Sequence, residues 1–201
     1  GRLYTDMTIN QILPRITSVI NRILHIGGTA TTQEGVVDIY LITSLAGGSG
    51  AGAFISIATS IKEQYDNKVN LYGFGVMHGV FQAMDPAGVT MQNVMYNGVS
   101  SIIDLDYLFT ASIENPIEFE LGGKIVRRTS PIFDKFVLVD NVSESGNVLN
   151  DVDELCEMLG LCMYSYAGDA GVKSESVLNN IDHKSKNYDV KHKMGWVMSA
   201  G

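Results

Sequence analysis

Residues 36–52 read VVDIYLITSLAGGSGAG, a run of apolar and β-branched residues that passes directly into a glycine-rich string. Residues 36–43 are nearly all apolar, which is typical of a strand buried on both faces of a parallel sheet. Four of the six residues from 47 to 52 are glycine. Residues 53–65 follow with apolar side chains at helical spacing, namely Phe54, Ile57, Ala58 and Ile61. The stretch therefore predicts a buried strand, a glycine loop over residues 44–52 and a helix packed on the sheet.

The rest of the chain continues this alternation of strands and helices. Apolar runs predict two further core strands at 69–77 and 133–140, and glycines 122 and 123 predict a hairpin inserted over 117–129. Helical periodicity predicts helices over 7–26, 88–109 and 148–167. The first contains Pro14 in its second turn and is expected to end at Gly27 and Gly28, and the second is expected to turn Met91, Met95, Val99, Ile102 and Ile103 inward. The pattern predicts an α/β fold with a Rossmann-like parallel sheet and helices on both faces.

Composition excludes several classes of protein. The 201 residues are 45% apolar and 18% charged, as in a globular domain, and the net charge of −8 argues against binding nucleic acid through phosphates. No apolar run is long enough to span a membrane. Cys156 and Cys162 lie six residues apart in an expected helix, which places them on different faces, and both are expected to be buried small hydrophobes. We expect a cytoplasmic location from these features.

The glycine loop carries the strongest chemical signal. A helix start offers unpaired N–H groups and a partial positive charge, and glycines let the backbone close around phosphate oxygens. The alternative is a tight turn that brings the helix close to the sheet. The loop lacks the Gly-Lys-Ser/Thr end of a Walker A motif. Gly48, Gly50 and Ala53 fit a dinucleotide fingerprint, but the next strand ends near Met77 with no acidic residue for a ribose.

The string Ala46-Gly47-Gly48-Ser49-Gly50-Ala51-Gly52 resembles the signature of the tubulin/FtsZ superfamily, small-Gly-Gly-Thr-Gly-small-Gly, with Ser49 in place of the usual Thr. The resemblance covers the chain: Leu71–Val76 followed by Phe81 looks like the next family strand and its exit. Asn93, Tyr96 and Asp104 resemble the helix pattern of the divergent bacterial tubulin-like branch. The resemblance implies that residues 1–178 form part of a GTPase-type domain, and that the amino-terminal third of that domain is absent from this chain. Residues 179–201 would then hold a catalytic-type loop and the start of a second domain.

The same resemblance implies roles for particular residues. Residues 46–52 would bind the phosphates of GTP or GDP with Mg²⁺, and Asn141, at the end of a strand, would contact the guanine base. Asn180 and Asp182 match the start of the family's catalytic loop, Asn-x-Asp-x-x-Asp; its third position is Ser185, so Asp189 would have to substitute. From the residues alone, Asn141 can equally be a turn residue, and residues 180–189 a polar connecting loop.

Three functions remain open at this stage. The first is a GTP-binding cytoskeletal protein that polymerises head to tail and hydrolyses GTP at the subunit interface, if the acidic loop is functional. The second is a tubulin-like scaffold that does not hydrolyse nucleotide, which Ser185 favours. The third is a Rossmann-type oxidoreductase that binds a dinucleotide.

Overall fold

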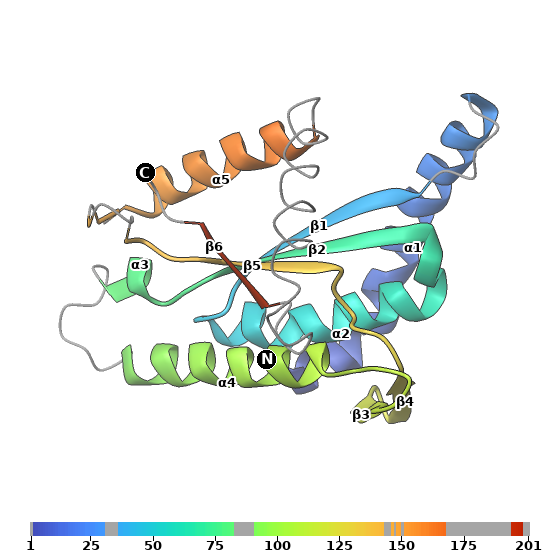
Figure 1. Cartoon of the computed structure of the whole chain (residues 1–201), viewed down its shortest axis with the longest axis horizontal. Coiled ribbons are helices and arrows are strands. Elements are labelled where there is room, and N and C mark those ends of the chain that lie inside the picture. Colours follow the sequence, from blue (N-terminus) through green and yellow to red (C-terminus); the bar gives the residue numbers. More distant parts are fainter. Residues whose placement is uncertain are drawn as a thin grey trace.

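Four parallel strands form the sheet at the centre of the computed structural model (Figure 1). Their order is β1-β2-β5-β6, and they comprise Val37–Ser44, Val69–Val76, Lys135–Val139 and Met194–Met198. The structure describes residues 2–30, 36–82, 91–142, 146, 148–149, 151–167 and 194–198. Strand β6 extends this same sheet beside β5. The predicted domain boundary after residue 178 lies outside the described residues.

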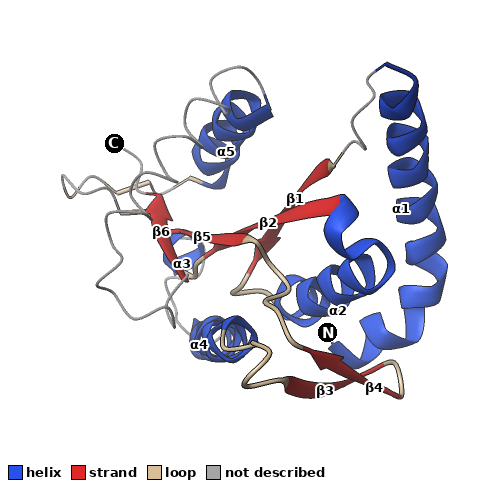
Figure 2. Cartoon of the chain, turned by 45° about the vertical axis from the view of Figure 1, so that its right-hand side comes forward, coloured by secondary structure: helices blue, strands red, loops and turns tan. Residues whose placement is uncertain are grey.

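Helices cover both faces of the sheet, as the sequence predicts (Figures 1 and 2). On one face, α2 (Gly48–Tyr65) and α4 (Met91–Phe109) bury their apolar sides against β2 and β5. The long helix α1 (Arg2–Ala30) packs on the outer side of α2. On the other face, α5 (Val152–Ala167) and the short α3 (Gly79–Gln82) close a second apolar core. The fold is therefore the Rossmann-like α/β class.

The carboxyl ends of three strands are aligned at one edge of the sheet, which we call the rim. The last residues of β1, β2 and β5 pair in register, Ser44 with Val76 and Val76 with Val139. The ladder continues past the strand ends, since Leu45 donates to the Val76 carbonyl over 2.9 Å and Met77 to the Val139 carbonyl over 2.8 Å. The segments that follow β1, β2 and β5 therefore all begin at the rim.

The first strand is less buried than its sequence predicts. Among the described strands β1 pairs only with β2, so it is an edge strand, and Ile42 is 47% exposed. The expectation that this run is buried on both faces is wrong, whereas β2 is buried along most of its length. Both strands read as apolar, but of these two only β2 has a described strand on each side.

Two helix boundaries also differ from the predictions. Helix α1 runs from Arg2 to Ala30; it contains Pro14, as predicted, but it begins earlier than residue 7 and is not ended by Gly27 and Gly28. Helix α2 begins at Gly48 instead of residue 53, so the second half of the glycine string forms a helical turn. Glycine disfavours a helix interior by only about 1 kcal/mol, which tertiary packing can offset.

The buried face of α4 is not the predicted one. Met95, Val99 and Ile103 are 46%, 53% and 63% exposed. The helix is buried instead through Leu105, Leu108 and Phe109, with Ser101 beside them. Because α4 carries apolar residues on two sides, periodicity could not identify the side that meets the sheet.

The predicted hairpin is confirmed as a separate two-stranded sheet. Strands β3 (Ile117–Leu121) and β4 (Lys124–Arg128) are antiparallel, and Gly122 and Gly123 form the turn with φ of 56° and 79°. Positive φ at both central positions defines the turn that matches the twist of a hairpin, and glycine adopts it without strain.

The two cysteines differ in environment. Cys156 is exposed, so the expectation that both are buried is wrong. Cys162 is partly buried, and this burial raises the pKa of its thiol because the thiolate is poorly solvated there. No helix in the described part of the chain has the length and apolar character to cross a membrane.

Asp66 ends α2 in a backbone conformation that favours glycine, with φ 35° and ψ −103°. We expect Asp66→Gly to raise the free energy of unfolding by about 1 kcal/mol, because glycine adopts positive φ without a Cβ clash. Losing the 3.5 Å contact between Asp66 and Arg128 costs little, since the Asp66 side chain is 72% exposed. Urea unfolding of both proteins measures the change; an unchanged or lower midpoint would contradict the assigned strain.

Candidate functional site

The glycine string leaves β1 at the rim and turns at once into α2. Leu45 and Ala46 are 0% and 1% exposed, so the start of the turn is anchored in the core. The Ser44 hydroxyl accepts hydrogen bonds from the amides of Ala46 and Gly47, each over 3.3 Å. These bonds fix the turn without help from a ligand.

Three backbone amides at the start of α2 face the rim without a helical partner. The first helical bond runs from the Ala51 amide to the Gly47 carbonyl over 3.0 Å, so the amides of Gly48, Ser49 and Gly50 precede it. No side chain caps the helix, and its first turn contains no acidic residue. Gly48 and Ser49 are exposed. The helix start therefore presents free N–H donors and a partial positive charge, an arrangement that accepts an anion.

The glycines of this turn have different roles. A Cβ at position 50 would lie 2.5 Å from the Ser44 carbonyl oxygen and 2.8 Å from Thr43 Oγ1, so only glycine lets α2 approach the strand end this closely. A Cβ at Gly48 would meet nothing within 4 Å. Of the predicted phosphate-binding residues, Ala46, Gly47 and Ala51 have partnered amides, and Gly52 lies inside the helix. The available donors are thus those of residues 48–50.

Two side chains of α4 contact the glycine turn. The Asn97 side chain donates to the Ala46 carbonyl over 3.1 Å. Ser101 donates to the Asn97 carbonyl over 2.8 Å and lies 3.5 Å from the Leu45 carbonyl. Neither residue is among those predicted from the sequence, although a polar pair one turn apart on the buried side of a helix is the signal that could have identified them.

Asn141 also lies at the rim, two strands from the glycine turn, a distance of about 10 Å at normal strand spacing. It is 6% exposed, and its side-chain amide donates to the Leu149 carbonyl over 3.1 Å. Its Oδ1 lies against Gly79, where a Cβ would collide with it. Asn141 therefore holds the segment after β5 close to the exit of β2, and contact with a base stays a prediction.

The other predicted residues are divided between the surface of α4 and undescribed parts of the chain. Asn93 and Tyr96 lie on the exposed side of α4, and Tyr96 is 66% exposed. Asn180, Asp182 and Asp189 lie outside the described residues. Within the described ranges no group of three His, Cys, Asp or Glu side chains could hold a metal. Magnesium therefore stays an expectation from the family resemblance.

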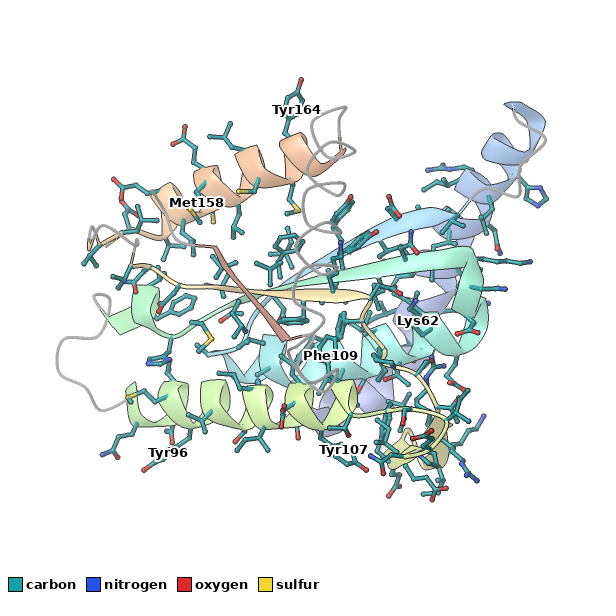
Figure 3. All side chains as sticks on the ribbon, viewed as in Figure 1. Lys62, Tyr96, Tyr107, Phe109, Met158 and Tyr164 are labelled. Atoms are coloured by element: carbon teal, nitrogen blue, oxygen red, sulfur yellow. The ribbon has the colours of Figure 1, made fainter. Side chains whose placement is uncertain are left out.

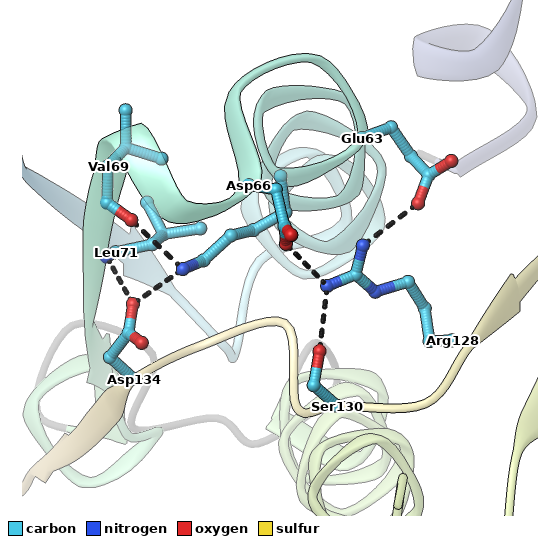
Figure 4. Close-up of polar contacts among 8 residues, drawn as sticks. Glu63, Asp66, Val69, Leu71, Arg128, Ser130 and Asp134 are labelled. Carbon is cyan, nitrogen blue, oxygen red and sulfur yellow. Dashed lines mark hydrogen bonds and ion pairs between the residues drawn. The ribbon is translucent and has the colours of Figure 1, made fainter. Parts of the chain in front are cut away.

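A polar hollow of about 390 Å³ lies at the opposite end of α2 from the rim, and Figure 4 shows the polar contacts around it. On one side, the buried Lys62 ammonium contacts Asp134 Oδ2 at 2.7 Å and the Val69 carbonyl at 3.0 Å. On the other, the Arg128 guanidinium contacts Glu63 at 3.0 Å and Ser130 at 3.1 Å. Every cation here has an acidic partner, so this hollow lacks the net positive charge of an anion site.

The fold and the rim together define an α/β protein of the doubly wound type, with an uncapped helix start at the carboxyl edge of its sheet. The chain matches the family described as tubulin like over residues 1–198, and it belongs to that family. Comparison with curated proteins and with solved structures finds no match.

Proposed function

We propose that this chain binds a nucleotide through the start of α2 and assembles with further copies head to tail. The observation that carries the proposal is the row of free amides at residues 48–50, placed where three parallel strands end in register. Ligands of open α/β sheets bind at this edge. Membership in the tubulin-like family supports self-association, and the resemblance of the glycine string supports GTP as the nucleotide.

The residues at the rim suit a polyphosphate. Its oxygens would accept from the amides of Gly48, Ser49 and Gly50, and the Ser49 hydroxyl would add a fourth donor. Asn97 and Ser44 hold the turn in place from either side, so these donors are fixed before the ligand arrives. A base directed along the rim towards β5 would approach the segment that Asn141 positions.

Assembly would place the carboxyl edge of one copy against the opposite end of the next. Such a contact is heterologous, so it propagates into an open filament and does not close on itself. In this proposal the neighbouring copy supplies Asn180, Asp182 and Asp189 to the γ-phosphate, where carboxylates orient a water for attack. Hydrolysis would then loosen the interface that the γ-phosphate had tightened.

A matched pair of substitutions at Gly48 tests the role of the amide. Gly48→Pro removes one N–H at the first position of a helix, where proline is tolerated. Gly47, which precedes it, has φ −86° and ψ 143°, the conformation that proline favours in its neighbour. Gly48→Ala keeps the amide and adds a Cβ in open space. We expect Gly48→Pro to weaken GTP binding about tenfold relative to Gly48→Ala, the loss of one charged hydrogen bond.

Titration calorimetry with GTP measures this difference, and circular dichroism confirms that both variants remain folded. Equal GTP affinities in the two variants would show that the Gly48 amide does not bind the nucleotide.

Sedimentation of the wild-type protein with GTP, GDP, ATP or a slowly hydrolysed GTP analogue tests assembly. A pellet that is indifferent to nucleotide would contradict the proposed switch, and stabilisation by NAD but not by GTP would favour the oxidoreductase.

A further inference from the structure

The described part of the rim contains carboxylates but no Lys or Arg. The glycine turn, residues 77–82 after β2 and the described residues that follow β5 have neither residue, and α4 and α5 have neither along their whole length. The segment after β5 and the start of α5 carry a group of acidic residues: Asp140, Asp151, Asp153 and Glu154. The contact between Asn141 and Leu149 holds this group at the rim. The rim is therefore acidic.

Outside α1, the Lys and Arg residues that the structure describes lie at the other end of the strands, which we call the amino end. They are Lys62, Lys68, Lys124, Arg127, Arg128 and Lys135. Figure 3 shows Lys62 at this end and Tyr96, early in α4, at the rim end. The amino end also carries acidic residues, and these pair with the two buried cations, Lys62 and Arg128. Charge is thus distributed unequally along the strands.

Two cations of the amino end are exposed and have no ion pair within the described ranges, Lys68 and Lys124. Arg127 lies 3.8 Å from Glu118, and Lys135 is half-buried. Lys124 belongs to the hairpin, where the exposed carboxylates of β3 lie on the paired strand. Lys68 immediately precedes β2, so its ammonium is the unpaired cation in line with the sheet.

The position of Lys68 decides which ligand it can contact. Strand β2 lies between β1 and β5, so its carboxyl end is at the middle of the rim, between the glycine turn and Asn141. The eight residues of β2 place Lys68 about 26 Å from the rim of its own copy, which is beyond the reach of a lysine side chain. In a head-to-tail row that follows the strands, the start of β2 in one copy comes opposite the end of β2 in the next.

We propose that Lys68 of one copy contacts the polyphosphate bound at the rim of the next copy, so that each nucleotide site is completed in trans. This inference rests on the proposed function. The amides of residues 48–50 carry only partial charges, and the carboxylates of the rim repel further negative charge. An ammonium from the next copy offsets this repulsion and forms a charge-assisted hydrogen bond with a phosphate oxygen. The bound nucleotide would then strengthen the contact between copies directly.

The test compares wild type with Lys68→Gln, Lys68→Arg and the matched control Lys124→Gln. Lys124 is also an exposed lysine of the amino end, but the hairpin lies beyond α2 and out of line with the strands (Figure 1). Sedimentation with a slowly hydrolysed GTP analogue gives the critical concentration for assembly. We expect Lys68→Gln to raise it about tenfold, through the loss of one charged hydrogen bond. We expect Lys68→Arg and Lys124→Gln to stay within about twofold of wild type.

Calorimetric titration below the critical concentration measures GTP binding by single copies. Lys68→Gln is expected to bind GTP as tightly as wild type does, because Lys68 lies far from the rim of its own copy. An unchanged critical concentration in Lys68→Gln, or an equal rise in Lys124→Gln, overturns the inference, and so does weaker GTP binding by unassembled Lys68→Gln. If wild type neither binds GTP nor sediments with it, the proposed function is wrong and the inference fails with it.

Discussion

Replacing Gly50 with alanine is expected to lower the free energy of unfolding by about 2–3 kcal/mol and to weaken nucleotide binding more than tenfold. The added Cβ would lie 2.5 Å from the Ser44 carbonyl oxygen and 3.2 Å from the Ser44 amide nitrogen. These are backbone atoms of a strand end that pairs with β2, so they cannot move away as a flexible side chain would. Helix α2 must shift instead, and the amides at its start shift with it.

Gly48→Ala serves as the matched control, because its Cβ meets nothing within 4 Å. Urea unfolding followed by circular dichroism measures stability, and calorimetric titration with GTP measures binding. We expect Gly48→Ala to unfold within about 0.5 kcal/mol of wild type. If Gly50→Ala is as stable as its control, the close approach of α2 to β1 is not present in solution.

Asp134→Ala is expected to lower the free energy of unfolding by about 3 kcal/mol, because it leaves the buried Lys62 ammonium without its acidic partner. The Lys62 side chain is only 7% exposed, and its ammonium lies 2.7 Å from Asp134 Oδ2. The same oxygen accepts the Leu71 amide over 2.7 Å, so the substitution also leaves a strand amide without its acceptor. Figure 4 shows both contacts meeting at this carboxylate.

The two halves of this pair are not equivalent, which makes the prediction testable. The Asp134 side chain is 43% exposed and keeps its bond to Leu71, so Lys62→Met is expected to cost about 1 kcal/mol. The double variant Lys62→Met/Asp134→Ala should be more stable than Asp134→Ala alone, since no unpaired buried charge remains. Urea midpoints rank the three variants. Equal losses in both single variants would show that Lys62 is solvated without its partner.

Much of the rim could be predicted because local chemistry determines it. A buried strand that passes into Gly47-Gly48-Ser49-Gly50 and then into a helix places an uncapped helix start at the edge of the sheet in any right-handed α/β arrangement. The different roles of the glycines within this string could not be predicted from the sequence. The clash that requires Gly50 and the open space at Gly48 arise from how closely α2 approaches Ser44. Asn97 was missed for the same reason, since its partner Ala46 is 51 residues away.

The sequence by itself determined the class of fold, the hairpin and the position of the glycine turn, because each depends on short-range pattern: apolar runs, helical periodicity and glycines at a tight turn. Only the tertiary structure decided that, among the described strands, β1 lies at an edge while β2 is central, since both runs read as apolar. It also decided that α4 turns Leu105 and Leu108 inward and leaves Val99 and Ile103 in water. Burial depends on which neighbours surround an element, and residues far apart in the chain supply those neighbours.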